Sequence, residues 1–252
     1  PATFTGNPTL NSVAAALTMA AVTLADGVTL ILGTGGGGTV SATSITGTAA
    51  GTASNVTFNV TGAVTVSGAI GTDIGTVTVT NSTFTGNGVG DGYTHAIYVN
   101  EVARFTVSNC AFNGTKVGHD IKSRALATTV SNTYLDDGVT GTTSYAVDLP
   151  NGGVANLDGL KVVQGKNSRN AIMIAYGAEG NLKAASSLTV TNSTFIDHLG
   201  TGSVVAVKNF TAVPVTLRDD SFQNIRTPLK GLGEIKASSY TATQHTAGAR
   251  GR

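Results

Sequence analysis

The 252-residue sequence holds few of the residues that cross-link or charge a protein. Cys110 is its one cysteine, so no disulfide can form within the chain and no zinc site of the CxxC type can be assembled. Tryptophan is absent, and only 12% of the residues are charged. We therefore expect a fold that is held by packing and backbone hydrogen bonds, with no metal and no cofactor.

The charges that are present are balanced. Fifteen Lys and Arg residues face 14 Asp and Glu residues, for a formal net charge of +1, and the basic residues form no run. Nucleic-acid binding requires a concentrated basic patch or stripe. The sequence therefore predicts no DNA or RNA partner.

Long apolar segments are missing as well. The longest apolar stretch, roughly residues 13–32, is broken by Thr18, Thr23 and Asp26, which argues against a membrane span. No positively charged leader precedes it. The start Pro1-Ala2-Thr3 is one that removal of an initiator methionine leaves, so we expect a protein made without a secretion signal.

Thr, Ser, Gly, Ala and Val dominate instead, and this composition favours strands and tight turns. Val, Ile, Leu and Phe recur at strand-like spacing, which excludes a disordered chain, and the 33 glycines keep no three-residue period, which excludes collagen. The length suits one solenoid, because a solenoid grows by adding coils. We expect one domain over residues 1–252.

One short phrase recurs along the chain and sets a period. Asn109 lies 28 residues after Asn81, Asn132 lies 23 residues after Asn109, and Phe222 lies 27 residues after Phe195. A leucine-rich repeat has a similar period, but it needs leucines at fixed offsets and a helix or 3₁₀ segment in each repeat. The β-branched, Thr-rich units predict an all-β parallel β-helix. The phrase is TVTNSTF at 78–84, TVSNCAF at 106–112, TVSNTYL at 129–135 and TVTNSTF at 189–195.

The two ends of the solenoid have different compositions. Residues 10–25 are Ala-rich and favour a short helix, which would cap the open first coil. The coils are expected over residues 26–237, with residues 26–32 as the first strand and thin or looped coils over residues 33–55. Residues 238–252 look like a polar, irregular tail.

A second strand can be aligned from coil to coil, with His95 opposite His119 and Ile97 opposite Ile121. Alternation places the isoleucines inside and sends the intervening side chains outward. Strands stack about 4.7–4.9 Å apart, so the outward Lys122 and Asp148 should be direct neighbours. The predicted outer column is Tyr98, Lys122, Asp148 and Met173, and the other outward residues are Asn100, Asp120 and Arg124.

Three blocks of this region resemble bacterial and phage right-handed β-helix proteins of the pectate-lyase-like superfamily. They are GHDIKSRA at 118–125, SYAVDLPNGG at 144–153 and IAYGAEG at 174–180, and the likeness covers roughly residues 90–225. The resemblance implies a right-handed parallel β-helix. It also implies a function among polysaccharide lyases, hydrolases, epimerases and phage spikes, although fold transfers better than activity.

The resemblance suggests one catalytic arrangement. A lyase that acts on a uronic-acid polymer must neutralise the sugar carboxylate and remove the adjacent proton, and superfamily members often use Lys or Arg for these tasks. Lys122 would be the base and Arg124 the carboxylate clamp, with Asp148 beside them. Lys122 and Arg124 lie on one strand, however, whereas related lyases place such residues on separate coils.

Two other interpretations of these residues remain open. Lys122 and Asp148 can form a plain salt bridge between coils, contributing about 0.2–1 kcal/mol. Asp120 and Asp148 are the one carboxylate pair that the alignment brings close enough for a hydrolase.

The remaining conspicuous residues divide into architecture and binding. The stacked His95 and His119 are expected at a corner, Glu179 in a structural turn, and the repeated asparagines in a buried or turn-forming ladder. The phenylalanines of the repeat are expected in the core. The candidate sugar-binding residues are Tyr98, Asn100, Asp120, Tyr145 and Tyr176.

The sequence thus leads to a β-helix that engages a polysaccharide, as a spike or fibre of a phage or phage-like particle. The alternatives are a polysaccharide lyase acting by β-elimination and a structural scaffold of a symmetric assembly. The expected partners are a polysaccharide, other particle proteins and two further copies in a homotrimer. The expected location is the particle surface, with an extracellular or periplasmic location as the alternative.

Overall fold

A computed structural model describes residues 1–11, 15–48, 51–62, 64–66, 70–71 and 73–241. Within these ranges all regular structure is β-strand, and every strand pair is parallel. No helix in the described part of the chain is long and apolar enough to cross a membrane. The strands form four sheets, which we call A to D.

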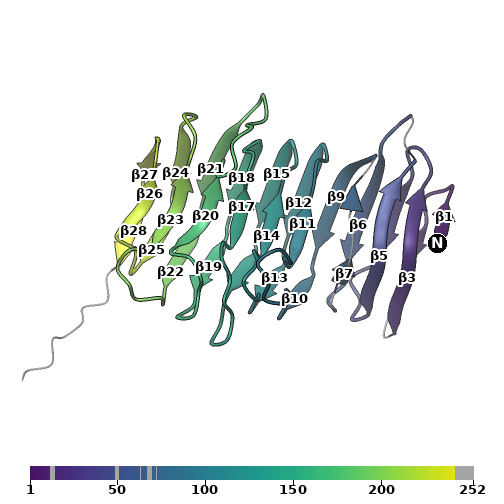
Figure 1. The fold of residues 1–252 in the computed structure, drawn as a ribbon, viewed down its shortest axis with the longest axis horizontal. Helices are drawn as coiled ribbons and strands as arrows, with labels where there is room; N and C mark the ends of the chain where they lie inside the picture. The colour runs from purple at the N-terminus through teal and green to yellow at the C-terminus, as the bar shows by residue number, and fades with distance from the viewer. Residues whose placement is uncertain (12–14, 49–50, 63, 67–69, 72, 242–252) are drawn as a thin grey trace, which may run out of the picture.

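Sheet B runs the length of the molecule and is the one sheet to which nearly every coil contributes (Figure 1). Its strands pair in the order of the chain, each with the strand one coil further on. They are β2 (Thr9–Leu10), β4 (Thr29–Leu32), β6 (Ser54–Asn59), β9 (Ile74–Thr80), β12 (Arg104–Ser108), β15 (Ala127–Ser131), β18 (Val154–Asp158), β21 (Ser187–Thr191), β24 (Val215–Arg218) and β27 (Gly233–Lys236).

Sheets C and D complete each coil from β10 onward. The chain passes from sheet B to sheet C, then to sheet D, and returns to sheet B. Sheet C contains β10 (Thr83–Thr85), β13 (Ala111–Asn113), β16 (Tyr134–Asp136), β19 (Lys161–Gln164), β22 (Thr194–Asp197), β25 (Ser221–Gln223) and β28 (Ser239–Thr241). Sheet D contains β11 (Ile97–Val99), β14 (Ile121–Ser123), β17 (Val147–Leu149), β20 (Ile172–Tyr176), β23 (Val205–Asn209) and β26 (Thr227–Lys230).

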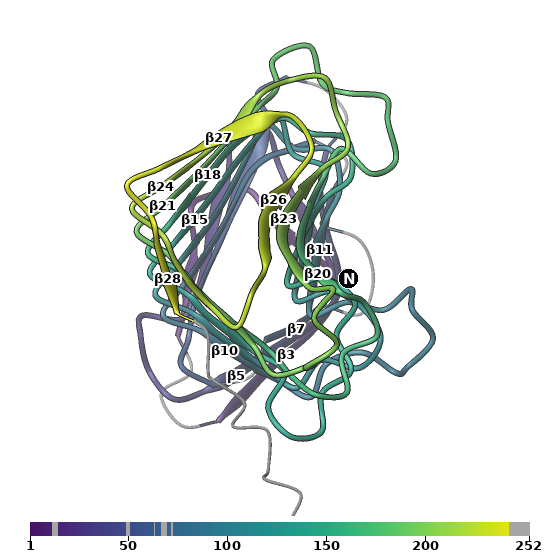
Figure 2. The same ribbon diagram turned by 90° about the vertical axis from the view of Figure 1, so that its left-hand side faces the viewer.

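Sheet A takes the place of sheets C and D in the first coils. It does not pair with either of them in the described residues, so the wall opposite sheet B is interrupted between the first coils and the later ones. Viewed along its axis, the ribbon winds as a stack of coils whose loops project from the corners (Figure 2), and the core side chains fill its interior. Sheet A contains β1 (Ala2–Phe4), β3 (Ala16–Leu24), β5 (Thr39–Gly47), β7 (Val64–Val66) and β8 (Ile70–Gly71).

These coils establish the predicted parallel β-helix. Inward side chains alternate with outward ones, as in β12, where Phe105 and Val107 are fully buried between more exposed neighbours. Because the register is in step, like side chains stack on one another. The rings of Phe84 and Phe112 stack with centroids 4.6 Å apart, which confirms that the repeated phenylalanines belong to the core.

The repeated asparagines turn the chain between sheets B and C. Asn81, Asn109, Asn132 and Asn192 have φ values of 53, 52, 47 and 52°, in the left-handed region that asparagine tolerates better than most residues. Their turn-forming role is confirmed. They are solvent-exposed, however, so the alternative of a buried ladder is wrong.

The predicted N-terminal capping helix is wrong. Residues 16–24 form β3, which pairs with β1 on one side and β5 on the other, while residues 12–14 lie outside the described part of the chain. In β3 the side chains of Leu17 and Met19 are more buried than those of Ala16, Thr18 and Ala20. This pairing and burial outweigh the helix propensity of alanine, which is a weak determinant in a packed protein.

Two further expectations about the ends need correction. Residues 39–47 form the nine-residue β5 where thin or looped coils were expected. The pairing of β1 with β3 shows that the coils also begin before residue 26, the predicted start. At the other end Ser239–Thr241 pair with β25 as β28, so the regular structure continues beyond residue 237. Residues 242–252 of the predicted tail lie outside the described part of the chain.

Candidate functional site

The outer face of sheet D carries the column of side chains on which the functional hypothesis rests. Strand pairing aligns Tyr98 with Lys122, Lys122 with Asp148 and Asp148 with Ala175. The predicted contact of Lys122 with Asp148 is confirmed. The predicted fourth member, Met173, is wrong by two residues: Ala175 takes that position, and Met173 is buried. The column continues through Lys208 and Lys230.

Lys122 lies between two carboxylates. Its Nζ is 3.1 Å from Asp148 Oδ2 and 2.8 Å from Glu179 Oε1. The Lys122 side chain is 11% exposed and that of Asp148 is 3% exposed, so this is a largely buried ion pair rather than a surface ladder. Removing one partner of such a pair leaves an uncompensated charge in a poorly solvated place.

Arg124 extends the cluster beyond the end of β14. Its Nη2 lies 2.5 Å from Glu179 Oε2, and its Nε donates to the Tyr98 hydroxyl at 2.7 Å. Its Nη1 donates to Asn151 Oδ1, and the Asn151 amide in turn donates to Gly180 O at 2.8 Å. One guanidinium therefore ties sheet D to the two turns that lead from sheet D back to sheet B.

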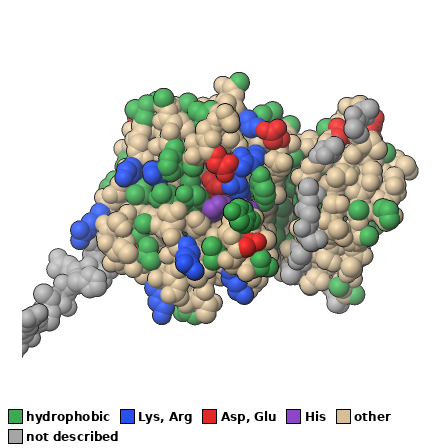
Figure 3. All heavy atoms as spheres, in the orientation of Figure 1, with side chains coloured by type: hydrophobic (Ala, Val, Ile, Leu, Met, Phe, Trp, Pro, Cys, Tyr) green, Lys and Arg blue, Asp and Glu red, His purple; other side chains and the backbone are tan. Residues whose placement is uncertain are grey.

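The two histidines and Tyr145 stack beside this cluster. The rings of His95 and His119 are 4.6 Å apart and those of His119 and Tyr145 are 4.9 Å apart. Each histidine Nδ1 accepts a backbone N–H of the next coil, at 3.0 Å from His119 and 3.1 Å from Tyr145. The expectation of stacked, hydrogen-bonded corner histidines is confirmed. Histidine, lysine and carboxylate side chains gather in the middle of the face shown in Figure 3.

The hydrogen bonds also fix the state of His119. Because Nδ1 accepts, the proton of the neutral ring is on Nε2, which lies 3.4 Å from Asp148 Oδ2. Burial, with smaller effects from His95 and Lys122, lowers the pKa of His119 to about 3. His119 is therefore a neutral neighbour of Asp148 at pH 7, and Lys122 alone supplies the compensating charge.

The charge state of Lys122 bears on the lyase hypothesis. Burial lowers its pKa, but the Glu179 and Asp148 carboxylates more than offset this and raise the pKa above the usual value for lysine. A general base must be unprotonated near the working pH. Lys122 is held as an ammonium ion, and the Arg124 fork is already occupied by Glu179, so neither group is free for the role that the resemblance suggests.

Two predicted sugar-binding residues are buried. Asp120 is 2% exposed and lines an interior cavity, because it precedes β14 in the turn where strand alternation no longer holds. It therefore does not meet Asp148, which contacts Lys122 on the outer face, and the proposed hydrolase pair is not formed. Tyr176 is fully buried opposite Leu149, and its hydroxyl donates to Gly153 O at 2.8 Å.

The other predicted binding residues lie at the surface. Tyr98 is 43% exposed and contacts Arg124. Asn100 is exposed in the turn after β11, and Tyr145 is partly exposed at the end of the histidine stack. These three residues remain candidates for contact with a ligand.

The coil-to-coil alignment of the sequence does not identify several residues of the site. Glu179 was assigned to a structural turn, yet it binds both Lys122 and Arg124 from more than fifty residues away. Asn151 was not singled out. Phe210 and Lys208 were also passed over: Phe210 is 41% exposed, and Lys208 Nζ lies 4.1 Å from its ring centroid. Only the coil-to-coil register, which the sequence did not fix beyond Asp148, aligns Lys208 with this face.

A cavity of ≈ 610 Å³ opens beside Tyr98, where sheet A ends and sheets C and D begin. Core side chains such as Phe58 and Phe84 line its floor, and polar groups stand at its rim. Its position next to the charged cluster follows from the interruption of the wall opposite sheet B. The rim residues include Asn87, Tyr93, Thr94, His95, Tyr98 and Asn100.

Within the described residues no group of three or more His, Cys, Asp or Glu side chains is arranged to hold a metal ion. Cys110 is buried as a free thiol, and burial raises its pKa. The outer face of sheet D carries cationic, hydroxyl and aromatic groups, among them Lys208, Tyr98 and Phe210.

The comparisons with known proteins agree with this architecture. The sequence model of a family described as right handed beta helix region matches residues 67–246. The chain belongs to this family, and the fold is a right-handed parallel β-helix. Searches of curated proteins and of solved structures gave no significant match.

Proposed function

We propose that this protein binds a polysaccharide along the outer face of sheet D. The observation that carries the proposal is the straight column Tyr98, Lys122, Asp148, Ala175, Lys208 and Lys230, which repeats at the strand spacing along the solenoid axis. Tyr98 at one end and Phe210 near the other expose aromatic rings that can pack on sugar faces. Asp148 and Ala175 are buried, so a linear polymer lying parallel to the axis would contact the column at its accessible members, Tyr98, Lys208 and Lys230.

The charges of this face favour an acidic polymer. Lys122 and Arg124 are neutralised by Asp148 and Glu179. Lys208 and Lys230 have no ion pair with any residue in the described part of the chain. They remain available to carboxylate or sulfate groups of a sugar chain, and such contacts weaken with added salt.

Affinity electrophoresis through gels that contain bacterial or algal polysaccharides tests the proposal. We expect retardation by at least one uronate-containing polymer, less retardation by a neutral polymer, and loss of most of it in the double variant Lys208→Gln/Lys230→Gln. The matched control is Lys161→Gln/Lys236→Gln, which removes two lysines from sheets C and B. Equal losses in both variants, or no retardation by any acidic polymer, would contradict the proposal.

The same samples separate binding from cleavage. A lyase would raise the absorbance of unsaturated uronate ends, and Lys122→Ala would abolish the rise if Lys122 takes part. Because Lys122 is held protonated between two carboxylates, we expect retention without any rise in absorbance. A rise that depends on Lys122 would replace the binding function with an enzymatic one.

The setting that we propose is a spike or fibre on the surface of a phage or phage-like particle, where the β-helix contacts host glycan as a homotrimer. A rigid solenoid presents a long recognition face, which supports this setting. Light scattering of the purified chain tests the trimer, and capsid or tail genes beside its gene would support the particle. A monomer encoded among carbohydrate-metabolism genes would favour the extracellular or periplasmic alternative.

A further inference from the structure

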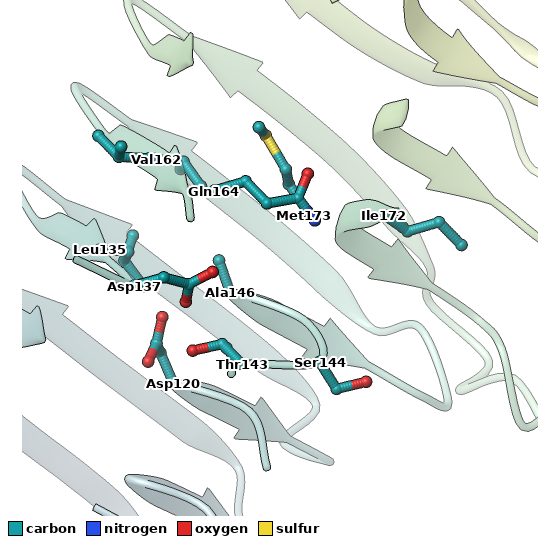
Figure 4. Close-up of a pocket in the computed structure, with 11 residues that line it drawn as sticks. Asp120, Leu135, Asp137, Thr143, Ser144, Ala146, Val162, Gln164, Ile172 and Met173 are labelled. Atoms are coloured by element: carbon teal, nitrogen blue, oxygen red, sulfur yellow. The ribbon is translucent and has the colours of Figure 1, made fainter. Parts of the chain in front are cut away.

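A small cavity of ≈ 10 Å³ lies inside the β-helix, at the corner between sheets C and D, away from the outer face (Figure 4). Its walls come from three successive coils. A volume of this size admits one atom as large as a water oxygen. The lining is mostly apolar, and its polar residues include Asp120, Asp137, Thr143 and Gln164.

Two polar side chains in this cavity have an unpaired oxygen. Asp120 Oδ1 and Gln164 Oε1 lack a hydrogen-bond partner, although Asp120 is 2% exposed and Gln164 is 5% exposed. The Gln164 amide nitrogen donates to Asn170 O, and this bond fixes the orientation of the amide. Buried oxygens without partners are rare, and each costs about 1–3 kcal/mol unless something binds to it.

The cavity also holds two carboxyl groups without a basic side chain beside them. Asp137 lines it beside Asp120, and Figure 4 shows the Asp120 side chain directed toward Asp137. No Lys, Arg or His is among the lining residues. Burial raises the pKa of both carboxyl groups. Asp137 and Asp136 raise that of Asp120 further, and Asp136 raises that of Asp137. Two buried carboxylates in one small space require either protons or a cation.

The donor atoms select the kind of cation. The carboxylates of Asp120 and Asp137, the amide of Gln164 and the hydroxyl of Thr143 are all oxygen ligands, which suit hard cations. Together these side chains carry six oxygens, the lower end of the 6–8 that Ca²⁺ takes, and one of them, Asp137 Oδ2, also accepts the Gly165 N–H at 3.0 Å and the Ser168 hydroxyl. Mg²⁺ usually keeps several waters, for which a cavity of ≈ 10 Å³ has no room.

We propose that this corner cavity is an interior calcium site, in which Ca²⁺ is held by Asp120, Asp137, Gln164 and Thr143. The ion would neutralise both carboxylates, satisfy the two unpaired oxygens and join three coils. With only two carboxylates, the dissociation constant is expected to be about 10⁻⁴–10⁻³ M, as in weak structural sites. The site is independent of polysaccharide binding on the outer face of sheet D.

Thermal unfolding of the full chain tests the site. The protein is unfolded in chelator and then refolded, because the cavity is internal and exchange in the folded state would be slow. Refolding is done in chelator, in 10 mM CaCl₂ or in 10 mM MgCl₂, at matched ionic strength. We expect calcium to raise the Tm by roughly 3–10 °C and magnesium to raise it by less than about 1 °C. Asp120→Asn should abolish the response, whereas Asp219→Asn, which changes an exposed aspartate, should retain it.

Metal analysis makes the test independent of the stability of the variants. After refolding in calcium and dialysis against 2 mM CaCl₂, the wild-type chain should hold about 0.7–0.95 bound calcium per chain more than Asp120→Asn. No calcium dependence of the Tm, or an equal response in Asp120→Asn, overturns the proposal. Unfolding that responds to pH but not to calcium would mean that Asp120 and Asp137 share a proton instead.

Discussion

Asp120 and Asp148 are aspartates of neighbouring coils, and each is 2% exposed, but their carboxyl groups have opposite surroundings. Asp148 faces outward from sheet D and meets the Lys122 ammonium at 3.1 Å. Asp120 faces an interior cavity that contains no basic side chain. Burial alone therefore does not define a site. The Lys122 ammonium compensates the charge of Asp148, whereas Asp120 must bind a proton or a cation from the solvent.

The pKa shifts of the two residues follow this difference. Burial raises the pKa of both carboxyl groups, but Lys122 counteracts the shift at Asp148. For Asp120, burial raises the pKa to about 8, with small further increases from Asp137 and Asp136. Asp148 is therefore one half of an ion pair, and Asp120 is a group whose protonation or metal binding affects stability.

The largest effect is expected from removal of the compensating lysine. Lys122→Met leaves Asp148 buried without a cation and should lower the free energy of unfolding by about 3–5 kcal/mol, measured by urea denaturation at pH 7. Arg124→Met is the matched control. Its partner Glu179 is 44% exposed and can be hydrated, so its loss should be about 1 kcal/mol. Equal losses in the two variants would show that Lys122 is not needed to compensate the buried charge of Asp148.

Isosteric replacement of each aspartate gives the next largest difference. Asp148→Asn removes the charge that Lys122 contacts and should cost about 1–3 kcal/mol, although Lys122 retains Glu179. Asp120→Asn at pH 8 without calcium removes a buried uncompensated charge and should cost less than about 0.5 kcal/mol or stabilise the fold. If Asp120→Asn proved as harmful as Asp148→Asn, the comparison between the two residues would fail.

The sequence predicted the contact of Lys122 with Asp148 but not the different environment of Asp120. Ile121 and Val147 occupy the same position in β14 and β17, so the alternation of side chains places the next residues, Lys122 and Asp148, side by side on the outer face. Asp120 lies one residue before β14, where the chain leaves a turn, and the inward and outward alternation of side chains along a strand does not apply there. The side-chain direction in a turn depends on the packing of the next coil.

The alignment also failed where coils differ in length. The length of the turn between β19 and β20 was misjudged, so Met173 was predicted opposite Asp148 where the structure has Ala175. Glu179 reaches Lys122 from a long turn whose path depends on packing against earlier coils. The repeat fixed the core phenylalanines and the left-handed asparagines because those positions recur in most coils. The site depends on loops that do not recur.

The pH profile of stability should separate the two kinds of buried group, with a smaller effect. The folded pKa of Asp120, about 8, is above the ordinary aspartate pKa of 3.8, so the folded state binds more protons and stability falls as pH rises from about 4 through 8. His119 behaves oppositely: its folded pKa of about 3 is below 6.5, so stability falls as pH drops from about 6.5 to 3.

The two contributions oppose each other between about pH 4 and 6.5, so without calcium urea denaturation should show a broad maximum of stability over this range, with a fall on either side. Asp120→Asn should flatten the alkaline side in part, because burial also raises the pKa of Asp220 to about 7 and that group acts in the same direction. Between about pH 4 and 6.5 the stability of Asp120→Asn should rise more steeply with pH, because the Asp120 contribution no longer opposes that of His119. An alkaline slope that is identical in Asp120→Asn would mean that Asp120 is not protonated in the folded protein.

The smallest expected effect concerns the neutral partner of Asp148. His119→Phe preserves the ring stack but removes the Nδ1 acceptor of the Tyr145 N–H and the Nε2–H beside Asp148. His95→Phe removes the equivalent acceptor of the His119 N–H and touches no carboxylate. Because a neutral donor at 3.4 Å contributes little, the two losses in unfolding free energy should differ by less than about 1 kcal/mol. A much larger loss for His119→Phe would mean that His119 shares with Lys122 the compensation of Asp148.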